Sequence, residues 1–140
     1  MFKLQRTKRI KDELALCDAD GNTMKIIEVD FDADVMGQRF HQAWNNIIKA
    51  EQMIKGFETS SDPAEMSGAF DAYGNAVLEM IRLVFGDENA VIIADHYENR
   101  PTEMATEVYP FIMQVVLPQV KAAADEKTER LRSNYKASKR

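Results

Sequence analysis

Apolar residues follow two different spacings along this chain, which divide it into a short extended start and a long helical remainder. Residues 13–17 and 24–29 are short, largely apolar runs, and Asp20 and Gly21 stand between them. Because Gly accepts a positive φ and Asp bonds its own backbone, this pattern predicts a β-hairpin at about residues 13–29. An isolated hairpin is marginal in water, so one face is expected to lie on the helices. Residues 2–4 are a candidate third strand.

Beyond the hairpin, apolar residues recur every three or four positions, which is typical of amphipathic helices. Residues 34–57 predict one long helix. Asp62 and Pro63 form a capping pattern that predicts the start of a second helix, which extends to Phe85. A short helix is expected at about residues 88–97. The predicted fold class is therefore α+β, mostly α, with an N-terminal β-hairpin followed by a bundle of four to five helices.

Two prolines interrupt the last helical region. Pro110 and Pro118 both lie inside it, and an interior proline costs about 3 kcal/mol or more because it removes a hydrogen bond and clashes with the preceding turn. The residue before a proline is also disfavoured in helical geometry. We therefore expect a short helix at 102–109 and a second one that begins at Pro110, kinks near Pro118 and ends at about Arg132.

Length and composition indicate one globular domain. The chain has 140 residues, of which 45% are hydrophobic and 29% charged, as is usual for a single-core domain. Residues 1–132 are expected to form that domain, and residues 133–140 a frayed basic tail. Cys17 is the only cysteine, which excludes an internal disulfide and favours a reducing compartment. With neither a signal-peptide pattern nor a membrane-length apolar run, the expected location is the cytoplasm.

Charge is unevenly distributed and bears on nucleic-acid binding. The net charge is −5. Residues 1–11 carry five Lys or Arg and no acid, and residues 121–140 carry a basic surplus of four, so the body between them carries −14. An acidic body repels phosphate over a Debye length of about 10 Å. We expect no specific nucleic-acid binding, although the basic ends keep a small helical nucleic-acid-associated regulator as an alternative.

Motifs for catalysis and metal binding are sparse. Residues 18–22 begin like a calcium loop, but Gly21 is the fourth residue of that loop instead of the sixth, and Val29 stands at position twelve, where an EF-hand requires Glu. Neither His41 nor His96 has a second His or Cys at zinc-ligand spacing. Cys17 lies near acids, which disfavour a thiolate. We expect no cofactor, no metal and no enzymatic activity; an enzyme of unrecognised type, supported only by His96 among acids, is a further alternative.

The segment from Tyr109 to Pro118 is apolar on nearly every side, wider than one buried helix face requires. Two interpretations stay open. The segment is either a central helix enclosed by the others, or part of it contacts another protein or a second copy of the chain. In the second case the candidate partner-binding residues are Tyr109, Phe111, Ile112, Met113 and Val116.

The order of these elements over residues 13–120 resembles a known family. An acidic hairpin with Asp20-Gly21 precedes two long helices, the turn at residues 85–89 and a short helix, and residues 107–112 lead to Pro118. This order resembles the tail assembly chaperones encoded in the tail modules of siphophages and prophages of Gram-positive bacteria. The resemblance implies a non-catalytic protein in the bacterial host that binds the tape measure protein, helps to recruit tail tube subunits and leaves the finished particle. It also implies that residues 121–140 end a short form of the protein, beside a frameshift-extended form.

Overall fold

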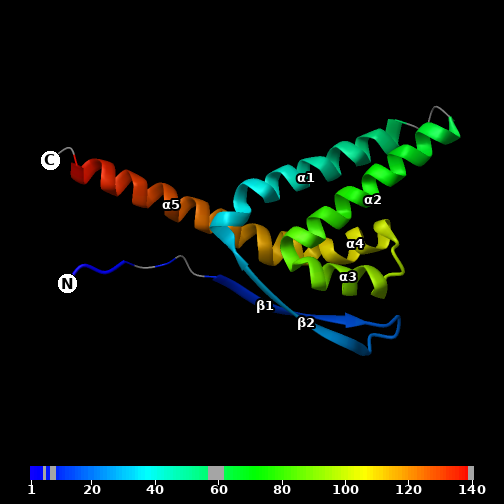
Figure 1. Ribbon diagram of the computed structural model, residues 1–140, viewed down its shortest axis with the longest axis horizontal. Coiled ribbons are helices and arrows are strands. Elements are labelled where there is room, and N and C mark those ends of the chain that lie inside the picture. The colour runs from blue at the N-terminus through cyan, green and yellow to red at the C-terminus, as the bar shows by residue number, and fades with distance from the viewer. Residues whose placement is uncertain (5, 7–8, 57–61, 139–140) are drawn as a thin grey trace.

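A β-hairpin is followed by helices that turn back on one another three times (Figure 1). The computed structural model describes residues 1–4, 6, 9–56 and 62–138. Its elements are β1 (Arg9–Cys17), β2 (Thr23–Asp32), α1 (Ala33–Gly56), α2 (Pro63–Phe85), α3 (Asp87–His96), α4 (Pro101–Phe111), the π-helix η1 (Ile112–Val116) and α5 (Leu117–Ser138). The predicted fold class, mostly helical with an N-terminal hairpin, is confirmed.

The hairpin forms where the Asp-Gly signal placed it, with longer strands than predicted. Gly21 has φ +87°, a conformation that side chains with a Cβ rarely adopt. The Asp18 carboxylate accepts hydrogen bonds from the backbone N–H groups of Asp20 (3.0 Å) and Asn22 (2.9 Å). These bonds, that of Asn22 above all, lower the pKa of Asp18. Among the residues described, the sheet has two antiparallel strands, and residues 2–4 do not join it as a third.

One face of the hairpin lies on the helices, as predicted. Alternate residues of the two strands are buried there, namely Ile10, Leu16, Ile27, Val29 and Phe31. Two polar side chains of α3 bind the strands through their backbone. His96 Nε2 donates to the Cys17 carbonyl at 2.9 Å, and Asn89 Nδ2 donates to the Glu28 carbonyl at 3.1 Å. The hairpin is therefore held by packing and by hydrogen bonds at both strands.

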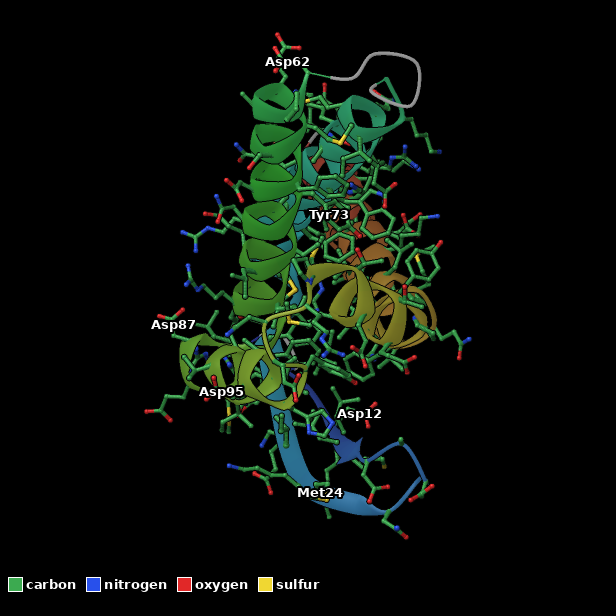
Figure 2. All side chains as sticks on the ribbon, turned by 90° about the vertical axis from the view of Figure 1, so that its right-hand side faces the viewer. Asp12, Met24, Asp62, Tyr73, Asp87 and Asp95 are labelled. Carbon is green, nitrogen blue, oxygen red and sulfur yellow. The ribbon has the colours of Figure 1, made fainter. Side chains whose placement is uncertain are left out.

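The helices α1 and α2 form a long antiparallel pair that ends far from the hairpin; Figure 2 shows Asp62 and Met24 at opposite ends of the molecule. The Asp62 carboxylate accepts from the Ala64 N–H at 3.1 Å, and Pro63 occupies the first turn, so the predicted start of α2 is confirmed. The predicted end of α1 at Phe57 lies outside the described residues. The apolar stripe of α2 is buried against α1, α3 and α4, with Val77, Met80, Ile81 and Val84 almost fully enclosed.

The predicted helix break at Pro110 is wrong. Residues 101–138 form one continuous helical rod, and Pro110 lies inside α4. The π-helix η1 lies immediately before the second proline, Pro118, and in it the Leu117 N–H donates to the Ile112 carbonyl, five residues back. Leu117 itself has helical angles (φ −59°, ψ −46°), contrary to the expectation for a residue before proline. The π turn therefore lies at the place where the sequence predicts a kink, and π turns are a known cause of helix bending.

Helix α5 continues to Ser138, past the end predicted at Arg132. No Gly or Pro follows Pro118 within α5, and Glu126 and Arg130 form an ion pair one turn apart (2.8 Å) that favours the helical form. Lys139 and Arg140, the last residues of the predicted tail, lie outside the described residues. The second half of α5 extends away from the body (Figure 1).

Two glycines of α2 provide a test of the packing between α2 and α4. A Cβ added at Gly68 meets open space, whereas a Cβ added at Gly74 would lie 3.2 Å from Pro101 Cγ. Gly68→Ala is expected to raise the free energy of unfolding by about 0.5–1 kcal/mol through helix propensity. Gly74→Ala is expected to lose that gain to the close contact with Pro101. Urea denaturation of both variants measures the difference, and equal stabilisation would contradict the close approach of α4 to α2.

Candidate functional site

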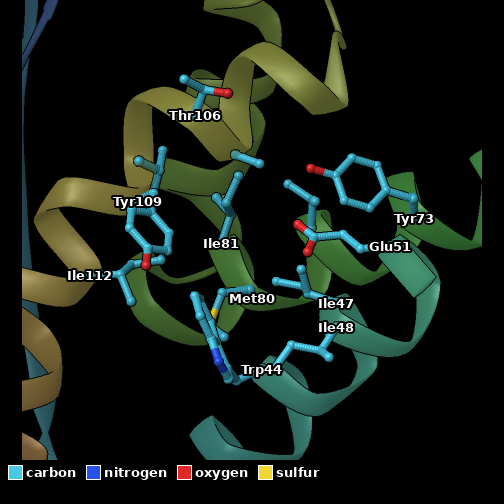
Figure 3. Close-up of a pocket in the computed structure, with 13 residues that line it drawn as sticks. Trp44, Ile47, Ile48, Glu51, Tyr73, Met80, Ile81, Thr106, Tyr109 and Ile112 are labelled. Carbon is cyan, nitrogen blue, oxygen red and sulfur yellow. The ribbon is translucent and has the colours of Figure 1, made fainter. Parts of the chain in front are cut away.

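An apolar groove lies between α1, α2 and α4, and it encloses a cavity of about 430 Å³ (Figure 3). Its floor is built from buried residues of α2, and its rim from partly exposed residues of α1 and α4. The lining residues are Trp44, Ile47, Ile48, Glu51, Tyr73, Val77, Met80, Ile81, Ala105, Thr106, Val108, Tyr109 and Ile112. A cavity of this size and lining is within the usual range for binding sites.

Helical spacing explains why these residues share one groove. On α1, residues 44, 47, 48 and 51 recur at the steps of three and four that align side chains on one helix face. On α2, residues 73, 77, 80 and 81 do the same, and residues 105, 108, 109 and 112 do so across the junction of α4 and η1. Three helix faces therefore converge without filling the space between them.

Aromatic rings form two walls of the groove. Trp44 and Tyr109 lie with ring centroids 5.7 Å apart and planes tilted by 33°, and Trp44 is also stacked on Phe40 at 6.4 Å. Tyr73 lies on the opposite side of the cavity (Figure 3). Rings held by other rings lose little further conformational entropy on binding, and this property makes Trp and Tyr common anchors at protein interfaces.

Among the described residues that line the groove, Glu51 is the one that carries a charge. Burial raises the pKa of the Tyr73 hydroxyl, and the Glu51 carboxylate raises it further. Tyr73 is therefore protonated at neutral pH and can donate a hydrogen bond. In a mainly apolar groove, Glu51 therefore supplies a negative charge and the Tyr73 hydroxyl a neutral polar group.

The structure divides the five predicted partner-binding residues. Tyr109, which is 48% exposed, and Ile112, which is buried, line the groove. Phe111 is half-buried and stacks on Phe85 at 5.6 Å, outside the groove. Met113 is half-buried and also lies outside it, and Val116 is completely buried. At Val116 the structure therefore agrees with the interpretation that the segment is an enclosed helix.

Sequence reasoning did not identify the other walls of the groove. Trp44, Ile48 and Tyr73 belong to the apolar stripes of the first two helices, and periodicity does not distinguish a buried residue from one that faces a cavity. Glu51 is the residue whose position in the sequence indicates that this face is not fully buried. A carboxylate at the i+7 position from Trp44 interrupts the apolar face of α1, and such an interruption is typical of a face that is only partly buried.

The residues considered for catalysis or metal binding lie apart from the groove. His96 bonds the hairpin backbone, His41 is exposed beside Phe40, and the Cys17 thiol is directed to the Ala15 carbonyl at 3.8 Å. Within the described part of the chain, no cluster of three or more His, Cys, Asp or Glu side chains could hold a metal ion. Among the helices of the described residues, none is long and apolar enough to span a membrane.

No protein-family model, curated protein or solved structure matches this chain. The groove and the order of the elements are therefore the observations from which a function is inferred.

Proposed function

We propose that this protein is a non-catalytic binding protein that holds an apolar helix of a larger partner in the groove between α1, α2 and α4. The observation that carries this proposal is the open apolar cavity of about 430 Å³ with the exposed rim residues Ile48 and Tyr109. Water in such a cavity has few polar partners, so its replacement by apolar side chains is favourable.

The shape and charge of the groove define the partner's chemistry. Because three helices form the walls, a fourth helix that presents apolar side chains at i, i+3, i+4 and i+7 completes the packing. Glu51 adds a negative charge beside aromatic faces. A Lys or Arg among the apolar anchors can lay its aliphatic stem on the groove and place its charge near Glu51. The expected ligand is an amphipathic helix with one basic residue on its apolar side.

The role that agrees with this chemistry is that of a tail assembly chaperone in the cytoplasm of a bacterial host. The order of the elements resembles that family, and the tape measure protein is long and helical, as the groove requires. In this role the protein covers apolar helices of the tape measure protein until tail tube subunits assemble around it. A gene for a tail tube protein upstream and one for a very long helical protein downstream would support the assignment.

The proposal predicts that one substitution at the groove rim weakens capture of the tape measure protein. Ile48→Glu places a second carboxylate beside Glu51 and removes an apolar contact, and it is expected to weaken binding by about tenfold or more. Coexpression with the tape measure protein of the same gene cluster, followed by calorimetry with its helical peptides, measures the effect. Ile48 is partly exposed, so circular dichroism and melting temperature are expected to show a folded variant.

Met53→Glu is the matched control. Met53 is another exposed apolar residue of α1, at 50% exposure, but it does not line the groove. The Met53→Glu variant is expected to bind the tape measure protein as tightly as the unsubstituted protein does. If neither substitution weakens a complex that does form, the binding site lies elsewhere. If the unsubstituted protein forms no complex with the tape measure protein, the chaperone role is wrong.

A further inference from the structure

The apolar stripe of α5 continues beyond the part of the helix that the body covers. Leu117, Val120, Ala124, Thr128, Leu131 and Tyr135 succeed one another at steps of three or four, and so they share one face. At the start of this stripe Val120 is buried and lies next to Gly37 of α1. Further along, Leu131 and Tyr135 are 62% and 60% exposed. One continuous surface therefore begins inside the core and ends in solvent.

An exposed helix segment with an apolar stripe is unfavourable for an isolated chain. Helices shorter than about 12–15 residues are marginal in water on their own, and most helical stability in proteins comes from packing of the apolar face. The C-terminal part of α5 extends away from the body (Figure 1), and residues 124–136 are exposed. The stripe shows which face is suited to packing.

We propose that this face binds the same face of α5 in a second copy of the chain, with the two helices antiparallel. The first argument is size. When Ala124 is placed opposite Tyr135, Thr128 falls opposite Leu131, so each large side chain meets a small one, as close packing of helices requires. Thr128 can be covered without cost, because its hydroxyl already donates to the Ala124 carbonyl at 3.0 Å.

The second argument is charge. In antiparallel pairs, residues on the same flank of the stripe meet across the interface. Asp125, Arg132 and Lys136 share one flank of α5. The register set by the apolar residues places Asp125 of each copy between Arg132 and Lys136 of the other, twice by symmetry. A parallel pair would instead bring Lys127 of one copy toward Arg132 of the other, which is repulsive. The charges therefore select a second copy and its direction.

The third argument is length. In this register Ser138, the last residue of α5 that the structure describes, falls opposite Lys121, which follows the buried Val120. Over the described residues, the two exposed halves therefore match in extent. Glu126 and Arg130, which pair with each other on the far side of the helix, remain in solvent.

The mass of the protein in solution tests the proposal. Sedimentation equilibrium is expected to show a dimer, and Leu131→Glu is expected to raise the dissociation constant by about tenfold or more. Val91→Glu is the control, because Val91 is similarly exposed (60%) but lies on α3. A chain that is monomeric at about 100 μM, a concentration at which a micromolar dimer is saturated, overturns the proposal. A dimer that Leu131→Glu does not weaken also overturns it.

Charge exchange tests the direction. Asp125→Arg alone is expected to weaken the dimer, and addition of Arg132→Asp and Lys136→Asp is expected to restore it, since every pair is intermolecular in the antiparallel arrangement. Failure to restore the dimer overturns that arrangement. The inference is independent of the groove: Ile48→Glu is expected to leave the dimer intact. Loss of the dimer in Ile48→Glu would show instead that α5 inserts into the groove of a neighbour.

Discussion

Val116→Asp is expected to leave the chain unfolded at 25 °C. Val116 has no exposed surface and lies among the buried residues of the core. An ionised carboxylate placed there has no partner, and an unpaired buried charge costs several kcal/mol even after its pKa rises. Domains of this size are stable by only about 5–15 kcal/mol, and the substitution also removes apolar packing, so the combined loss is expected to exceed the stability of the fold. Far-ultraviolet circular dichroism and urea denaturation measure the loss.

Gln114→Asp is the matched control for this prediction. Gln114 lies in the same π-helix, two residues away, and is exposed. Its replacement is expected to change the free energy of unfolding by about 0.5 kcal/mol or less. Met113→Asp, at a half-buried position outside the groove, is expected to fold and to keep binding a partner helix. A folded Val116→Asp variant would contradict the enclosure of this segment in the core.

The hairpin and the first three helices were predictable because local signals agreed with the global fold. Asp20-Gly21 encodes a turn by its backbone conformation, and Asp62-Pro63 encodes a helix start by its cap. Both signals act over a few residues, so tertiary contacts are not needed to interpret them. The boundaries of β1 and β2 were less accurate, because the pairing of Ile10 with Phe31 depends on the helices that cover this face.

The last helix differs from the prediction because the local cost of proline does not decide the backbone conformation there. Pro110 and Pro118 each destabilise a helix, but burial of the residues on both sides of them outweighs this cost. Met104, Val108, Ile112, Val116 and Val120 are all buried, and they span the two prolines. A break at either proline would turn some of these side chains away from the core. Tertiary packing therefore decided the backbone conformation.

The groove could not be predicted for a related reason. Apolar periodicity identifies which residues of α1 and α2 face inward, but not how closely a third helix approaches them. That distance depends on residues such as Gly74 and Pro101, which set the contact between α2 and α4. Tyr109 was identified because it belongs to a segment that is too apolar for one face. No such signal marks Ile48, which belongs to an ordinary amphipathic stripe.

Deletion of Gln114 is expected to be tolerated, although deletion inside a helix is usually disruptive. The buried residues of the rod recur every four positions from Met104 to Val120. In a regular α-helix each step of four turns about 40° beyond a full circle, so this stripe would drift around the rod. The π turn holds more residues and corrects the drift. Removal of one residue converts the wide turn to a regular one and leaves Ile112 and Val116 three positions apart, still on one face.

The expected result is a folded protein whose free energy of unfolding changes by about 1 kcal/mol or less, since an exposed side chain is removed and the buried set is kept. Deletion of Glu79 is the control. Glu79 is also exposed, but it lies in the regular part of α2. Its loss rotates the buried residues Met80, Ile81 and Val84 by about 100° relative to the start of the helix, with a cost of about 2–5 kcal/mol for each displaced side chain. Circular dichroism and urea denaturation distinguish the two deletions, and equal damage by both would show that η1 does not act as an inserted residue.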